Sequence, residues 1–207
     1  MPSATKIIAT VAGVSTVGGG VGLSIHLLNK YPTISTKLTS EGFELASTEQ
    51  DWTKLSEAHN KLVAPTDKVF KEEGTANKDW KWLKSKCEKA LSSEENDQTN
   101  YKLARQWCVK ETDVNAILGK TKGKFKILSS NTTSADSNSW SEKVQNLNQD
   151  TTAISALGLQ KTGTKNISFD DLKGKCTSIL TTKTTAGDFN DKFELAKKWC
   201  FISNTAS

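Results

Sequence analysis

The sequence predicts a mainly α-helical protein in which an N-terminal transmembrane helix precedes two repeated small helical units of about three helices each. Three observations lead to this prediction. A long uncharged segment stands near the N-terminus, and two sets of Leu, Trp and Cys markers recur in the same order in the two halves. Around those markers, apolar residues are spaced three and four apart, as on one face of a helix. Only three Pro occur in 207 residues, so little interrupts helices.

The first element is the uncharged segment at residues 7–28, which contains no Asp, Glu, Lys or Arg and is flanked by Lys6 and Lys30. A helix of this length spans about 33 Å, which is enough for a bilayer core of about 30 Å. We therefore expect a cytoplasmic tail at residues 1–6 and an uncleaved transmembrane anchor. The predicted location is the cell membrane, with a single pass and the C-terminal region extracellular.

Two other interpretations of residues 7–28 stay open. The segment could be a cleaved signal peptide, although the apolar run is longer than usual and residues 29–32 offer no small-x-small cleavage site. It could also be a segment that does not enter the membrane. Gly18 and Gly22 form a GxxxG motif, which allows two transmembrane helices to approach closely. The oligomeric state therefore remains undecided.

An internal repeat follows the predicted anchor. The sequence LKSKC at residues 83–87 recurs as LKGKC at 172–176, and LARQWC at 103–108 recurs as LAKKWC at 195–200. The same markers in the same order indicate a duplication.

A Trp precedes each set of markers at nearly the same distance. Trp52 lies 35 residues before the first Cys of its half, and Trp140 lies 36 residues before the first Cys of the other. We take the repeat units as residues 38–115 and 120–203. A stretch rich in Gly, Lys, Ser, Thr and Asn at 119–139 contains the junction.

Each unit contains apolar residues at helical spacing. Trp80, Leu83 and Cys87 are spaced three and four apart, and their counterparts in the second copy keep this spacing. The predicted core residues are Trp52, Trp80, Leu83, Trp107, Trp140, Phe169, Leu172 and Trp199. The candidate helix N-caps are Thr48, Asn77, Ser139 and Ser168. Short apolar pieces at 43–46 and 125–128 are expected to be extended or to form a short helix.

The four cysteines allow three interpretations: one disulfide per unit, buried free thiols, or a metal site. A metal site is disfavoured because there is no CxxC motif and only two histidines occur. Pairing within a unit, Cys87–Cys108 and Cys176–Cys200, is favoured because each copy of a repeat must be complete alone. Small extracytoplasmic domains with thin cores often use such cross-links. Buried thiols that behave as small apolar residues remain the alternative.

No catalytic residue, cofactor-binding residue, cofactor or metal is predicted. Nucleophilic catalysis by Ser or Cys needs a neighbouring base. Of the two histidines, His26 lies in the anchor, and His59 stands alone on a charged helix, where a structural role is favoured. The net charge of +5 is spread among interspersed acids and bases, which argues against a nucleic-acid surface. The Trp residues could bind sugar or lipid, but their regular positions in the repeat favour core packing.

The arrangement resembles the paralogous surface-protein families of haemotropic mycoplasmas. The shared features are the N-terminal anchor, the sequence EGFEL at residues 41–45, and the LKxKC and LAxxWC markers. The resemblance covers most of the chain. It implies a surface-displayed, antigenic and variable protein of a wall-less bacterium, and it brings no catalytic residues.

The expected function is that of a non-catalytic, membrane-anchored and surface-exposed repeat protein for antigenic display or host-cell contact. Its expected partners are the membrane and a host-cell surface or antibody, with no nucleic acid. The alternative is a structural or assembly protein that binds a neighbouring membrane protein. The segments that differ most between the copies, residues 92–99 and 181–189, are expected to carry recognition.

Overall fold

A computed structural model describes residues 32–62, 68–71, 78–120, 125–128, 130–133, 138–163 and 165–203. The predicted tail at 1–6 and the predicted anchor at 7–28 lie outside these residues. Among the residues described, no helix combines the length and apolar character needed to cross a bilayer.

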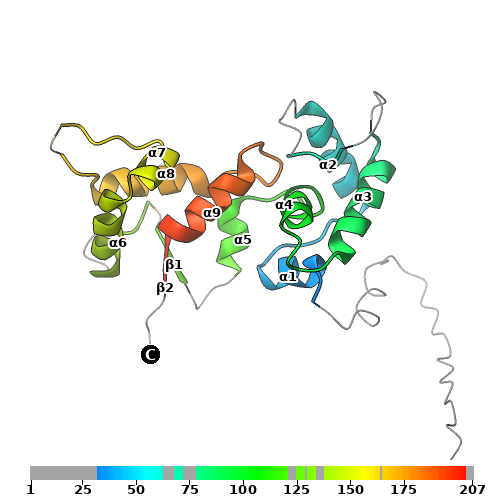
Figure 1. Ribbon diagram of the computed structural model, residues 1–207, viewed down its shortest axis with the longest axis horizontal. Coiled ribbons are helices and arrows are strands. Elements are labelled where there is room, and N and C mark those ends of the chain that lie inside the picture. The colour runs from blue at the N-terminus through cyan, green and yellow to red at the C-terminus, as the bar shows by residue number, and fades with distance from the viewer. Residues whose placement is uncertain are drawn as a thin grey trace, which may run out of the picture.

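The described part of the chain is mainly helical, with nine helices and one sheet of two short strands (Figure 1). In chain order the elements are α1 (Ile34–Ser40), α2 (Glu49–Lys61), α3 (Trp80–Ser92), α4 (Gln98–Trp107), α5 (Val114–Gly119), β1 (Phe125–Ile127), α6 (Asn138–Gln149), α7 (Thr151–Ala156), α8 (Phe169–Leu180), α9 (Phe189–Trp199) and β2 (Phe201–Ser203).

More helices are present than the three per unit that the periodicity predicts. The additional elements α1, α5 and α7 are six or seven residues long. Fewer than two full turns contain too few apolar positions to show a helical period. The general prediction of a mainly helical protein is confirmed, and the finer estimate of about three helices per unit is too low.

Two of the predicted helix starts are confirmed, and two are corrected. Thr48 and Ser168 each form a capping box with an Asp three residues on, at the starts of α2 and α8. Helix α3 is instead capped by Asp79, whose carboxylate accepts the Trp82 N–H at 2.8 Å. The predicted cap Asn77 lies outside the described residues and precedes this position by two. Helix α6 begins at Asn138, so Ser139 lies within its first turn.

The two apolar pieces that precede the leading helices are extended, and they make equivalent contacts in the two halves. Leu45 lies opposite Val109 in an antiparallel bridge. In the second half, β1 pairs antiparallel with β2, and Ile127 lies opposite Phe201. In each case the piece pairs with the residue directly after the second Cys of its half. The duplication is therefore visible in the backbone pairing as well as in the sequence.

Both predicted disulfides are present. Cys87–Cys108 joins α3 to the end of α4, and Cys176–Cys200 joins α8 to the end of α9, each with a Cα–Cα distance of 5.4 Å. All four residues are 0% exposed. The alternatives of free thiols and of a metal site at these cysteines are wrong, because every sulfur is cross-linked.

Six of the eight predicted core residues are buried, and the other two lie at the edge of the core. Those with at most 4% exposure are Trp52, Leu83, Trp107, Trp140, Leu172 and Trp199. Trp80 and Phe169 are half-buried and pack against the core from its edge. Each is the first residue of its helix, so its side chain lies where the apolar face meets solvent.

The two halves share one hydrophobic core. Helix α4 packs against α9, and α5 packs against α8 and α9 (Figure 1). The ring of Phe43 lies 5.3 Å from that of Phe193 and 6.4 Å from that of Phe189. The division into units at 38–115 and 120–203 stays a prediction, but the halves are packed together and do not hang as separate beads.

Gly42, which precedes Phe43, allows this close packing. Its φ is +91°, a conformation that residues with a Cβ rarely adopt. A Cβ at this position would also lie 2.7 Å from the carbonyl oxygen of Ile117 in α5. The turn after α1 can therefore approach α5 only with glycine at this position.

Candidate functional site

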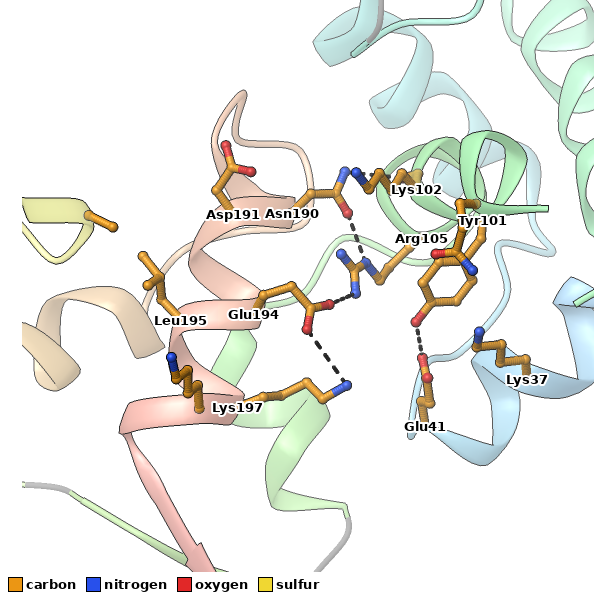
Figure 2. Close-up of a pocket in the computed structure, with 13 residues that line it drawn as sticks. Lys37, Glu41, Tyr101, Lys102, Arg105, Asn190, Asp191, Glu194, Leu195 and Lys197 are labelled. Atoms are coloured by element: carbon orange, nitrogen blue, oxygen red, sulfur yellow. Dashed lines mark hydrogen bonds and ion pairs between the residues drawn. The ribbon is translucent and has the colours of Figure 1, made fainter. Parts of the chain in front are cut away.

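A pocket of about 700 Å³ lies between the two halves of the molecule. Figure 2 shows its walls, which come from α1 and the turn after it, from α4, from α9 and from the end of α7. The pocket therefore exists only because the two halves are packed together.

Arg105 of α4 forms the link between the two sides of this pocket. It is 1% exposed. Its Nε donates to Asn190 Oδ1 at 2.8 Å, and its guanidinium pairs with the carboxylate of Glu194 on α9. The guanidinium carbon also lies 5.0 Å from the ring centre of Tyr101 and 4.7 Å from that of Phe193. A buried cation is thus neutralised across the boundary between the halves.

Tyr101 and Glu41 form the opposite wall. The Tyr101 hydroxyl donates to the Glu41 carboxylate, and Lys37 Nζ lies 4.2 Å from the centre of the Tyr101 ring. Burial, followed by the hydrogen bond to Glu41, raises the pKa of Tyr101 far above its usual value. The hydroxyl therefore stays protonated and remains a donor near neutral pH.

The charged groups of the pocket have both signs. Lys37, Lys102, Arg105, Lys197 and Lys198 oppose Glu41, Asp191 and Glu194, which leaves a balance of two positive charges. Lys197 lies 3.9 Å from Glu194, and Lys198 Nζ lies 2.9 Å from a carboxylate oxygen of Asp150. Lys102 makes no ion pair with any residue that the structure describes.

The pocket forms where equivalent helices of the two copies meet. The markers LARQWC and LAKKWC lie on α4 and α9, which places Arg105 and Lys197 at equivalent positions. Lys102 and Glu194 are likewise equivalent. This repeat position therefore carries opposite charges in the two copies, and the acidic member, Glu194, pairs with Arg105 of the other copy. Comparison of the aligned copies could have revealed this substitution, although not the burial that gives Arg105 its role.

The disulfide cysteines do not line the pocket. Cys108 and Cys200 instead hold the C-terminal ends of the two helices that form it. None of the predicted core residues lines the pocket either. Sequence reasoning therefore identified the cross-links at the ends of α4 and α9, and it missed the residues that line the pocket.

The segment at 181–189 is partly buried against the other half of the molecule, whereas Thr181, Lys183 and Asp188 are exposed, and its expected role in recognition stays a prediction. Thr184 is fully buried, and its N–H donates to the Thr112 carbonyl at 2.8 Å. The Val114 N–H donates to the Thr182 carbonyl at 3.1 Å. These hydrogen bonds join the segment to the other half of the molecule. In the segment at 92–99, by contrast, the side chains at its tip, Glu94–Asn96, are exposed.

His59 lies away from the pocket in a structural setting. Its Nε2 accepts the Phe70 N–H at 3.2 Å, and its ring centre lies 5.0 Å from that of Trp107 and 5.5 Å from that of Trp82. Burial, with a smaller effect from the Lys78 charge, lowers the pKa of His59 to about 4. A neutral histidine that accepts a backbone hydrogen bond in the core fits the structural interpretation.

No cluster of His, Cys, Asp and Glu suited to a metal ion occurs among the residues that the structure places. Comparisons of the chain with protein-family models, curated proteins and solved structures find no match. The fold and the pocket are therefore interpreted from their own geometry.

Proposed function

We propose that this chain is a membrane-anchored, surface-exposed and non-catalytic repeat protein, which presents its packed helical units outside the cell for host-cell contact or antigenic display. The observation that carries the proposal is the pair of disulfides, Cys87–Cys108 and Cys176–Cys200. Disulfides persist in extracytoplasmic compartments, whereas cytosolic thiols are kept reduced. The resemblance to mycoplasma surface proteins and the uncharged segment at 7–28 agree with this location.

The same disulfides would stabilise the helical units of a protein that must stay folded outside the cell. The paired cysteines are separated by 21 and 24 residues, and closing loops of this size stabilises a fold by roughly 3 kcal/mol each in the chain-entropy model. Contact with other molecules would then occur through exposed polar segments on a rigid support. The exposed tip at Glu94–Asn96 is the best candidate for such contact.

Surface labelling tests the location. Intact cells that produce the full chain are treated with a membrane-impermeant amine reagent, and labelled lysines and disulfides are mapped by non-reducing mass spectrometry. We expect label on exposed lysines such as Lys89 and Lys102, together with both disulfides. A cytosolic protein of the same cells serves as the unlabelled control. Label that appears only after lysis, with four free thiols, would refute the proposal.

The anchor is tested separately. The double substitution Val14→Lys and Val17→Lys places two charges in the uncharged segment, and each costs about 3 kcal/mol at the centre of a bilayer. We expect the variant to leave the membrane fraction. The intact mass of the parent chain should include residues 1–31. A chain that begins after this segment would show cleavage and would refute the anchor.

A further inference from the structure

Helix α3 carries a positive charge that its counterpart α8 lacks. The two helices occupy equivalent places in the repeat, because α3 contains the LKSKC marker and α8 contains LKGKC. Helix α3 has four lysines and one glutamate, which gives a net charge of +3, whereas the two lysines of α8 are balanced by two aspartates. The positive excess therefore belongs to the first half alone and not to the shared plan of the repeat.

The stability of α3 does not account for its lysines. Lys81 lies in the first turn, where the helix dipole disfavours a cation, and the equivalent residue of α8 is Asp170, which has the favourable sign. Lys89 lies in the last turn, where a cation is favourable, but it is three residues from Lys86, and like charges at that spacing repel. A role outside the helix is therefore needed to explain the set.

These lysines lie on the outer side of the first half. Helix α3 packs against α1, α2 and α4, and Figure 1 shows it at the edge of the molecule, away from the second half. Lys81, Ser85 and Lys89 are exposed and spaced four apart, so they form a row along the helix, which Lys86 flanks. At about 1.5 Å per residue, this row spans about 12 Å. Lys81, Lys86 and Lys89 together are called the α3 lysine face.

The α3 lysine face is not neutralised from within the protein. None of its three lysines forms an ion pair with a residue in the described parts of the chain. The nearby acids are already engaged, because Asp79 caps the start of α3 and Glu88 pairs with Lys84 at 4.0 Å. The ammonium groups are spread along the helix and not gathered around one point. They therefore suit a partner that carries several anionic groups along its length.

The surroundings of the lysines disfavour a bilayer as that partner. The exposed residues of α3 are all polar: Lys81, Ser85, Glu88, Lys89 and Ser92. A helix that lies in a membrane surface buries an exposed apolar face in the lipid. The apolar face of α3 is instead packed in the core, where Leu83, Cys87 and Ala90 are buried.

The same surroundings disfavour a nucleic acid, whose bases stack on open aromatic rings. Lys81 Nζ lies 5.5 Å from the centre of the Trp80 ring. The Nζ atoms of Lys78 and Lys86 lie 4.8 and 5.6 Å from the centre of the Trp82 ring. Because lysines lie over both rings, the face suits a polyanion that has no bases.

We infer that the α3 lysine face binds a sulfated polysaccharide of the host-cell surface. Such a chain is linear, carries ionised sulfates at intervals and has no bases, so its sulfates can pair with successive ammonium groups while the Ser85 hydroxyl donates a hydrogen bond. The inference rests on the proposed function for the source of the polysaccharide, and it names the chemistry of the proposed host-cell contact.

Heparin is the probe that tests this inference. The full chain is placed in phosphatidylcholine nanodiscs, and binding of fluorescent heparin is followed by anisotropy at about 0.15 M salt. We expect a Kd below about 10 μM, and binding at least about tenfold weaker for desulfated heparin, single-stranded DNA and phosphatidylserine nanodiscs. No saturable heparin binding, or equal binding of any of the other three probes, would overturn the inference.

Two triple variants locate the bound heparin. Replacing Lys81, Lys86 and Lys89 by Gln should weaken heparin binding at least about tenfold and reduce its dependence on salt, because three ammonium–sulfate contacts are lost. The matched control replaces three exposed lysines outside α3, Lys102, Lys165 and Lys197, by Gln, and should change affinity by less than about threefold. Circular dichroism and non-reducing mass spectrometry check that both variants are folded. Equal weakening in the two variants would show that binding follows net charge and would overturn the assignment.

The binding test and the test of location can fail separately. Absence of heparin binding by a chain that is labelled on intact cells would overturn this inference and leave the proposed function standing. Heparin binding by a chain that is labelled only after lysis would refute the proposed function and, with it, the host-cell source of the polysaccharide.

Discussion

Replacing Glu194 by Gln should destabilise the fold more than the exposure of this residue suggests. Glu194 is 56% exposed, but its carboxylate neutralises Arg105, which is 1% exposed. Removing one member of a fully buried pair costs about 3–5 kcal/mol, because the other charge is left without a partner. Solvent screens part of this pair, and the amide can still accept a hydrogen bond. We therefore expect a loss of about 2 kcal/mol in the free energy of unfolding.

The partner substitution separates this explanation from simple loss of contact. Arg105→Met replaces the guanidinium by an apolar side chain of similar length, and Glu194 can then turn toward water. This single change should cost about 1 kcal/mol, through loss of the contacts with Tyr101 and Phe193 and of the hydrogen bond to the half-buried Asn190. The double variant should be more stable than Glu194→Gln alone, because no buried charge remains.

Urea unfolding of the oxidised full chain, followed by tryptophan fluorescence, measures these differences. Glu88→Gln is the matched control, because Glu88 pairs with Lys84 at 4.0 Å and both side chains are exposed. It should change stability by less than about 0.5 kcal/mol. If Glu194→Gln behaves like this control, or if the effects of the two substitutions simply add, the buried charge does not govern the contact between the halves.

Three further outcomes can be measured by the same method. The pKa of His59 is about 4 in the folded chain and about 6.5 in the unfolded chain. The stability that the neutral form confers is therefore present above pH 6.5 and is lost as the pH falls, by roughly 3 kcal/mol at pH 4. His59→Gln should flatten this pH dependence of stability, and an unchanged slope would contradict the assignment. Replacing Cys176 and Cys200 by Ala should lower stability by about 3 kcal/mol, and a change below about 1 kcal/mol would argue against the cross-link. Gly42→Ala should destabilise by more than about 2 kcal/mol through its positive φ and the steric clash. Its control, Gly174→Ala, should stabilise by about 0.5–1 kcal/mol, because a Cβ there meets nothing within 4 Å inside a helix; two effects of the same sign would refute the distinction.

Much of the local structure could be predicted from the sequence. Apolar spacing identified α3, α4, α8 and α9, and Thr48 and Ser168 marked two helix starts correctly. These features depend on residues within a few positions of one another, so the pattern along the chain contains them. The cysteine pairing was also accessible, because the duplication requires each copy to close its own cross-link.

The candidate site was not accessible in this way. Arg105 and Lys197 occupy equivalent positions in matching motifs, yet one is buried in an ion pair and the other is exposed. The difference arises because α4 and α9 pack against each other, and the side chains that meet there are almost ninety residues apart in the chain. The internal contacts of the segment at 181–189, where Thr182 and Thr184 are bonded to the other half, were likewise not visible in its divergence.

By itself, the sequence determined the helical character, the duplicated plan and the cross-links, because helical periodicity, capping and repeat spacing are short-range properties. Only the tertiary structure decided that the two copies share one core and enclose a charged pocket between them. Which faces of two similar units come into contact depends on the shape and charge of whole surfaces, which combine side chains that are far apart in the sequence.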